Sequence, residues 1–149
     1  MVARFEKFSL LISELSRFWH KLATDVMEVY GLKGPYAVYF TTLYHYEEGL
    51  TAVKLSEMCS RDKSDVSRAI SLLEKRGLAE KISNNNNYYR AKIVLTEEGR
   101  KIAQEINIKT QIAVNNGGHG LDEEQRENFY NALQLISDNL RELSAKGLK

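Results

Sequence analysis

Residues 54–78 encode two short amphipathic helices in immediate succession, and this pattern constrains the fold more than any other feature of the chain. The first predicted helix follows Thr51, a candidate N-cap, places Leu55 and Met58 on one face and closes at Cys59. The second begins at Asp62, whose carboxylate can accept hydrogen bonds from the unpaired amides of the first turn. A tight turn joins the two helices, and a glycine stop and a hairpin follow them. The segment therefore predicts a short helix held against a partner helix.

The second helix of this pair has two chemically distinct faces. Val66, Ile70 and Leu73 recur at i, i+4 and i+7 and form a single apolar stripe. At 100° per residue the opposite face carries hydroxyl and cationic side chains, namely Ser64, Arg68, Ser71 and Lys75, with Ser67 on its flank. A helix that exposes small hydroxyls and cations, supported by a partner helix, suits insertion into a DNA major groove. We therefore expect this face to contact duplex DNA.

The residues after this pair predict a short β-hairpin. Residues 78–83 read as one strand, residues 84–87 are four asparagines that suit a turn, and residues 88–95 read as the return strand. Basic side chains lie along it, namely Lys81, Arg90 and Lys92. The hairpin is therefore predicted to be a basic wing beside the helix pair.

Long helices with apolar seams are predicted at both ends of the chain. The first spans 4–30 and carries Phe8, Ile12, Leu15, Trp19, Leu22, Val26 and Val29 at alternating spacings of four and three. The last follows a capping box at 122–125 and carries Phe129, Leu133, Ile136, Leu140 and Leu143 at the same spacings. Two further helices are predicted at 36–47 and from 97 to about 114. We expect the end helices to bury each other across a subunit interface, and an intramolecular bundle is the alternative.

The distribution of charge supports a nucleic-acid partner although the total does not. The net charge of the chain is only +1. Residues 61–92 nevertheless carry eight lysines and arginines against four acids, a local balance of +4. Phosphate affinity follows local charge more than the total. The positive charge thus lies on the segment already expected to meet DNA, although a solvated surface can look similar.

Several other classes of protein are disfavoured by the sequence. A single cysteine excludes an internal disulfide, no apolar run is long enough to span a bilayer, and the charged N-terminus does not read as a signal peptide. We therefore expect a cytoplasmic protein that does not enter membranes. His20, His45 and His119 have no helical partner at i+4, and no nucleophile–base spacing or glycine-rich phosphate loop is present. We expect no enzyme activity, no cofactor and no metal.

The order of these segments resembles the MarR family of bacterial transcriptional regulators, which are winged helix-turn-helix homodimers. The match rests on GPYAVYFTTL at 34–43, LTAVKLSEMCSRDKSDVSRAISLLEKRGLAEK at 50–81 and RAKIVLTEEGRKIA at 90–103. The resemblance implies a mainly α fold with a small β-wing. It also implies a single domain, 1–149, with dimerisation helices at 1–31 and 97–149 and a winged helix-turn-helix lobe at 34–96.

The resemblance assigns roles to the basic and hydroxyl side chains. The residues expected to contact base edges are Ser64, Ser67 and Arg68. Those expected to contact phosphates are Lys63, Ser71 and Lys75, with Lys54 and Arg61 as further candidates. Arg90 is the candidate for an arginine that reaches the minor groove, with Lys92 next to it on the wing. This chain has NNNNYYRAK where many members have Asp-x-Arg, so Tyr88 and Tyr89 are alternatives for that position. It also has Ser60 where the family usually has glycine.

The resemblance further implies a small aromatic effector bound between the dimerisation helices and the lobe. Aromatic side chains that could line such a cleft are Trp19, Tyr36, Tyr39, Phe40 and Tyr44, and the alternative is that they fill the core. Some members sense oxidants through cysteine. Cys59, however, stands at an apolar position, so we expect it to pack in the core.

Together these features predict a homodimeric regulator, a repressor, that binds a pseudo-palindromic operator and is released by an effector. The alternative is a winged-helix module that contacts other proteins and does not bind DNA. Steep salt dependence of DNA binding would separate the two.

Overall fold

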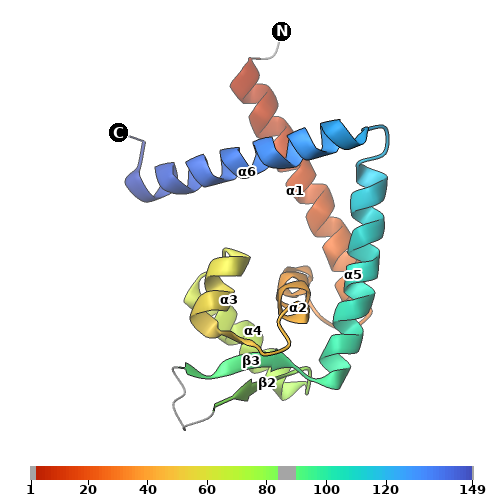
Figure 1. The fold of residues 1–149 in the computed structure, drawn as a ribbon, viewed down its shortest axis with the longest axis vertical. Coiled ribbons are helices and arrows are strands. Elements are labelled where there is room, and N and C mark those ends of the chain that lie inside the picture. The colour runs from red at the N-terminus through yellow and green to blue at the C-terminus, as the bar shows by residue number, and fades with distance from the viewer. Residues whose placement is uncertain (1–2, 84–89, 149) are drawn as a thin grey trace. The chain divides into compact units, whose positions relative to one another are not determined.

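The computed structural model describes residues 3–83 and 90–148 of the chain, which forms two units, residues 1–110 and 111–149 (Figure 1). Its elements in chain order are α1 (Arg4–Glu28), a 3₁₀ turn η1 (Gly34–Tyr36), α2 (Ala37–Tyr44), β1 (Leu50–Thr51), α3 (Ala52–Cys59), α4 (Lys63–Lys75), β2 (Ala79–Ile82), β3 (Lys92–Leu95), α5 (Glu97–Gly117) and α6 (Glu123–Lys146). Helix α5 runs across the boundary between the units. The elements from η1 to β3 form what we call the lobe, residues 34–96.

Local side-chain caps define the helix pair, as the sequence predicted. The Thr51 hydroxyl accepts a hydrogen bond from the Lys54 amide at 3.2 Å and so begins α3. The Asp62 carboxylate accepts from the Asp65 amide at 2.8 Å and begins α4. Between the helices, Ser60 adopts φ 51°, ψ 45°, the left-handed conformation for which glycine is better suited. The turn therefore keeps its tight geometry with serine in place of glycine.

Helix α4 ends in a backbone arrangement that leads directly into the sheet and then into α5. Gly77 has φ +69°, and the amide of Leu78 donates to the Leu73 carbonyl at 2.8 Å. Gly99, in the first turn of α5, lies so close to the residue before β2 that a Cβ added there would be 1.9 Å from the Leu78 carbonyl oxygen. The glycine of the predicted VLTEEGR segment is thus required by a close approach of two backbones.

The sheet has three antiparallel strands in the order β1-β3-β2. β2 and β3 pair Ala79 with Leu95, and β1 and β3 pair Leu50 with Ile93. β1 was not predicted, because two residues show no alternation and their partner lies more than forty residues along the chain. β3 begins at Lys92, later than the predicted return strand. The asparagine tip and the two tyrosines after it, residues 84–89, lie outside the described residues.

The core of unit 1 lies where the apolar faces of α2, α3 and α4 meet the sheet. Its fully enclosed side chains include Met27, Phe40, Leu43, Leu55, Val66, Leu73, Ile93 and Ile106. Cys59 is buried with them, as expected. Met58, which the sequence placed on one face with Leu55, is 40% exposed. Leu55 and Cys59, four residues apart, form the inner face of α3 instead, and Met58 lies outside that stripe.

Two helix boundaries differ from the sequence-based expectation. Helix α2 ends at Tyr44 rather than 47, because the amides of His45 and Tyr46 turn back to the carbonyls three residues earlier, at 3.3 and 3.1 Å. Helix α5 continues beyond 114 to Gly117, and the Gly118 amide still donates to the Val114 carbonyl at 3.0 Å. In both places a backbone hydrogen bond outweighs the preference of the local residues.

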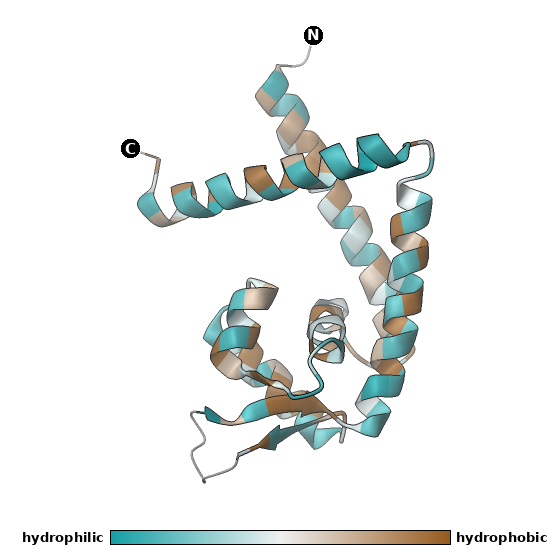
Figure 2. Ribbon diagram, in the orientation of Figure 1, coloured by the Kyte–Doolittle hydropathy of each residue, from teal (hydrophilic) through white to brown (hydrophobic). Residues whose placement is uncertain are grey.

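The long helices α1 and α6 keep most of their apolar side chains at the surface. Only Met27 of α1 is buried, and no residue of α6 is buried. Figure 2 shows hydrophobic residues recurring along both ribbons. The predicted capping box of α6 is present, since Asp122 accepts from the Gln125 amide at 2.8 Å and Gln125 accepts in return. Among the helices of residues 3–83 and 90–148, none is long and apolar enough to cross a membrane.

Candidate nucleic-acid interface

Helix α4 separates an apolar inner face from a polar outer face. Val66, Ile70 and Leu73 are each at most 2% exposed, so they anchor the helix in the lobe. The side chains predicted to face DNA are all exposed, and we call them the α4 outer face: Ser64, Ser67, Arg68, Ser71 and Lys75. The anchored stripe holds this face at a fixed orientation. The side chains of the α4 outer face are therefore free to contact the base edges and phosphates of a major groove.

The first turn of α4 is organised around the Asp62 carboxylate. It accepts one hydrogen bond from the Asp65 amide and another from the Ser64 hydroxyl, each at 2.8 Å. These two bonds, that of the Asp65 amide above all, hold the pKa of Asp62 below its usual value. Because the Ser64 hydroxyl proton is engaged, its oxygen presents lone pairs outward. Ser64 is therefore arranged as a hydrogen-bond acceptor.

The side chain of Arg68 is the principal cation of the α4 outer face. Its side chain is 70% exposed, and one terminal guanidinium nitrogen, Nη2, donates to the Asp65 carboxylate one helical turn earlier. The planar guanidinium can still offer its other N–H groups to the two acceptors of a guanine. Asp65 was not singled out in the sequence, although its i, i+3 spacing from Arg68 was the available signal.

The cationic side chains assigned to phosphates lie on and around this helix and are exposed, as is the fifth assigned residue, Ser71. The cations are Lys54 on α3, Arg61 in the turn, and Lys63 and Lys75 at the two ends of α4. Lys54 lies 3.8 Å from Glu57, an exposed pair that is readily exchanged for another partner. The Ser56 hydroxyl donates to the Arg61 carbonyl at 2.5 Å and so fixes the backbone of the turn.

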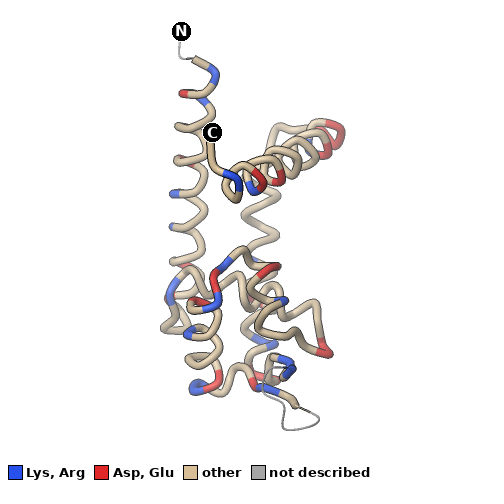
Figure 3. The backbone as a smooth tube through the Cα atoms, turned by 90° about the vertical axis from the view of Figure 1, so that its left-hand side faces the viewer, with Lys and Arg blue, Asp and Glu red and all other residues tan. Residues whose placement is uncertain are grey.

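The described part of the wing adds three more exposed cations, of which Lys81 on β2 lies 3.5 Å from the Glu74 carboxylate of α4. Lys92 begins β3, where it pairs with Ile82 of β2 on one side and with Thr51 of β1 on the other. Arg90 precedes it and is also exposed. Figure 3 colours the lysines and arginines of the lobe blue and its acids red. The cations of the helix pair and of the wing therefore belong to one folded lobe.

Arg76 is a further residue of this region that the sequence did not identify. It lies at the end of α4 and donates to the carbonyls of Tyr30 and Gly31, at 2.6 and 3.2 Å. The Tyr30 hydroxyl in turn donates to the Glu105 carboxylate of α5, and burial followed by this bond raises the pKa of Tyr30 to about 12. These contacts tie the end of α4 to the end of α1 and to α5. No local pattern signals them, because the partners are 45 or more residues apart.

The five aromatic residues considered for an effector lie in different environments. Tyr39 and Phe40 are buried in the core, and the ring of Tyr36 packs 6.3 Å from that of Tyr39. Tyr44 is half-buried, with the Arg100 guanidinium 4.9 Å above its ring. Trp19 is half-exposed on α1. Tyr39 and Phe40 thus serve the core, while the other three retain accessible surface.

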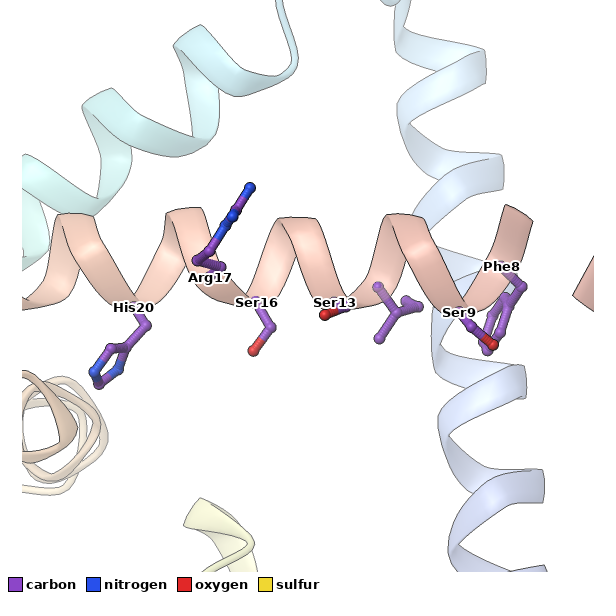
Figure 4. A pocket seen from close by; sticks show the side chains of 7 residues that line it. Phe8, Ser9, Ser13, Ser16, Arg17 and His20 are labelled. Atoms are coloured by element: carbon purple, nitrogen blue, oxygen red, sulfur yellow. The ribbon is translucent and has the colours of Figure 1, made fainter. Parts of the chain in front are cut away.

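A groove of about 600 Å³ runs along α1, and its lining comes from that helix alone. Figure 4 shows its side chains: Phe8, Ser9, Ser13, Ser16, Arg17 and His20. The seventh lining residue is Ile12. None of the five aromatic candidates lines this groove.

Cys59 has the properties of a structural thiol. It donates to the Thr42 hydroxyl at 3.5 Å, and burial raises the pKa of the thiol. A raised pKa lowers the fraction of reactive thiolate at neutral pH. In the part of the chain that the structure describes, no group of three or more His, Cys, Asp or Glu side chains is placed to hold a metal ion.

Transcriptional regulators are similar to this chain in sequence. A family model described as the sugar-specific transcriptional regulator TrmB matches residues 27–94, which contain almost the whole lobe. A curated relative, the uncharacterized HTH-type transcriptional regulator YybA of Bacillus subtilis (strain 168), is 28% identical over 112 residues. That alignment covers 72% of this chain and 71% of the relative.

Solved structures extend the similarity to nearly the whole chain. A putative MarR family transcriptional regulator from Listeria monocytogenes, complexed with 26mer DNA, has a TM-score of 0.84 at 22% identity and covers 100% of this chain and 98% of its own. CouR from Rhodococcus jostii RHA1, bound to p-coumaroyl-CoA, has a TM-score of 0.79 at 18% identity and covers 91% and 95%. This likeness confirms the predicted fold class, mainly α with a small β-wing.

Proposed function

We propose that this chain, which has the winged helix-turn-helix fold of the MarR-family transcriptional regulators, is a sequence-specific DNA-binding regulator in the cytoplasm. The observation that carries the proposal is the α4 outer face: an exposed row of hydroxyl and cationic side chains on a helix whose other face is anchored in the core. Ser64, Ser67 and Arg68 would contact base edges. Lys54, Arg61, Lys63, Ser71 and Lys75 would contact phosphates, and Arg90 and Lys92 of the wing would reach the adjacent groove.

The apolar residues of the end helices support a homodimer as the binding form. Phe129, Leu133, Ile136, Leu140 and Leu143, which we call the α6 seam, are all exposed in one chain. A second copy would cover them and the apolar face of α1, and two-fold symmetry would place two α4 helices in successive major grooves. The operator is then pseudo-palindromic, with half-sites about one helical turn apart.

Regulation by an effector is the finer part of the proposal. A repressor of this kind occupies its promoter until a small aromatic molecule changes the spacing of the two lobes. Support comes from the accessible aromatic surface of Trp19, Tyr36 and Tyr44, and from the relative CouR, which was solved with p-coumaroyl-CoA bound. Such a ligand would have to bind two forms of the dimer with different affinity: the form whose lobes are spaced to fit the operator, and a form whose lobes are spaced differently.

Selection of duplexes from a random pool, followed by titration, tests the proposal. We expect an enriched inverted repeat, and an affinity that falls about 10³-fold or more between 50 and 200 mM salt, since eight or so phosphate contacts release counterions. Arg68→Ala should remove about 1–3 kcal/mol of preference for the selected site and have a much smaller effect on a scrambled duplex. Arg141→Ala is the control, because Arg141 has the same i, i+3 pairing on α6.

The competing function is a winged-helix module that contacts protein and not DNA. It predicts no enriched sequence and a DNA affinity that is weak at every salt concentration. An equal loss of specific and non-specific affinity in Arg68→Ala would remove the base-reading role and leave Arg68 as a phosphate contact.

A further inference from the structure

An acidic side chain lies beside the arginine that would read bases. Asp65 is in the first turn of α4, and its carboxylate accepts a hydrogen bond from Nη2 of Arg68. Its side chain is 43% exposed, at the edge of the α4 outer face. A carboxylate so close to DNA repels phosphates and therefore weakens binding to every sequence. Its presence on this face calls for a compensating role.

Asp65 is itself held by the helix cap. Its amide donates to the Asp62 carboxylate at 2.8 Å, so its backbone is fixed at the point where α4 begins. The carboxylate then fixes the end of the long Arg68 side chain. An arginine that is already ordered loses less rotamer freedom when it binds. The chain Asp62–Asp65–Arg68 thus presents the guanidinium fork in one orientation.

We propose that Asp65 is a positioning residue for Arg68, which it aims at a guanine and holds away from phosphates; this rests on the proposed DNA-binding function. The hydrogen bond to Asp65 uses one N–H group of Arg68 Nη2. The other N–H groups of the guanidinium stay available for the two acceptors on the major-groove edge of guanine. A free arginine of the same length can instead swing to a phosphate, which every sequence offers. Asp65 therefore increases discrimination at the expense of affinity.

The chain contains a matched control for this proposal. Asp138 and Arg141 on α6 form an ion pair with the same i, i+3 spacing and nearly equal exposure. At 100° per residue, Asp138 lies opposite the α6 seam, so its replacement leaves that apolar face unchanged. Asp65→Asn and Asp138→Asn each remove one negative charge. Only the first removes it from the α4 outer face.

The experiment measures the dissociation constants of wild type, Asp65→Asn and Asp138→Asn for the selected duplex and for a scrambled one, at two salt concentrations. For Asp65→Asn we expect affinity for the scrambled duplex to rise about two- to threefold, because one repulsive charge is lost. The ratio of specific to non-specific affinity should fall about tenfold. In an Arg68→Ala background, Asp65→Asn should leave that ratio unchanged, and Asp138→Asn should leave it unchanged in either background.

Other results would overturn the proposal. If Asp65→Asn lowers specific and non-specific affinity together, Asp65 is only a first-turn acid that stabilises the helix. If it behaves as Asp138→Asn does, or still changes the ratio without Arg68, the pair has no role in reading bases. A wild-type protein with no sequence preference would overturn the proposed function, whereas the three outcomes above leave that function standing.

Discussion

Helices α4 and α6 carry apolar side chains at the same spacing, but those of α4 are buried and those of α6 are exposed. In α4, Val66, Ile70 and Leu73 are at most 2% exposed, because α3 and the sheet cover them. In the α6 seam, the corresponding side chains are 37–49% exposed. A spacing of four and three therefore predicts a helix and its apolar face with equal success in both places. It does not predict whether the cover comes from the same chain.

The two regions also differ in how they are secured. The lobe is joined to the segments that flank it by contacts between distant residues, such as those of Gly99 with Leu78 and of Arg76 with Tyr30 and Gly31. Unit 2 has local contacts: the capping box of α6, and Arg126, which donates to the Gly118 carbonyl at 2.9 Å. We infer that the lobe is stable within one chain and that α6 depends on a partner for its burial.

The largest expected effect is the loss of dimerisation when charges are introduced into the α6 seam. The double substitution Leu133→Asp and Leu140→Asp should convert a dimer into a monomer, because it would bury unpaired charges in an apolar interface at a cost of about 4 kcal/mol or more. Sedimentation at micromolar concentration measures this. Asn131→Asp, on the other side of α6, is the control and should remain dimeric. A double variant that still sediments as a dimer would show that the α6 seam is not the interface.

A second substitution acts within unit 1 and does not depend on association. Gly99→Ala places a methyl group 1.9 Å from the Leu78 carbonyl oxygen, and α5 can relieve this clash only by moving away from the backbone at Leu78. We expect the free energy of unfolding to fall by about 2–4 kcal/mol. Denaturant titration measures the loss, and Gly117→Ala serves as the control because no atom lies within 4 Å of its added Cβ. Equal stability of the two variants would contradict the close approach.

Substitution of Arg76 and of Arg126 tests one long-range contact against one local contact. Both donate to backbone carbonyls, Arg76 across 45 residues and Arg126 across eight. Arg76→Ala should cost about 1–2 kcal/mol and accelerate hydrogen exchange of the amides at 29–33. Arg126→Ala should accelerate exchange only near residues 116–121. If both variants show the same local pattern, the contact of Arg76 does not join α4 to α1.

The smallest effect is a pH dependence. The pKa of Tyr30 is about 12 in the folded chain against 10.0 for the free group, so its contribution is fully present below pH 10 and is lost as the pH rises towards 12. Tyr30→Phe should therefore be less stable than wild type by about 1 kcal/mol or less at pH 8. The difference should shrink at pH 11. The other tyrosines titrate in both proteins, so a difference that stays constant with pH would contradict the bond to Glu105.

Much of the fold and of the candidate site was accessible from the sequence. The caps at Thr51, Asp62 and Asp122, the buried stripe of α4, the buried Cys59 and the exposure of every residue assigned to DNA were anticipated. Each depends on residues within one or two helical turns. The roles of those residues on DNA stay predictions, as does the effector site.

Other features were missed for a physical reason. Strand β1 exists because β3 offers it hydrogen-bond partners, and nothing in Leu50–Thr51 alone indicates a strand. The role of Arg76 and the Tyr30–Glu105 bond require segments that meet only after the chain has folded. The early end of α2 and the extension of α5 likewise reflect backbone hydrogen bonds that side-chain patterns do not reveal.

The sequence by itself determined where helices begin, which faces are apolar, and which face of α4 is left to interact, because these depend on the spacing of neighbouring side chains along the chain. Only the tertiary structure decided which apolar faces are covered, which backbones touch at Gly99, and how Arg76 and Tyr30 join α4, α1 and α5. These contacts depend on the distance between segments in space, and short-range periodicity carries no information about that distance.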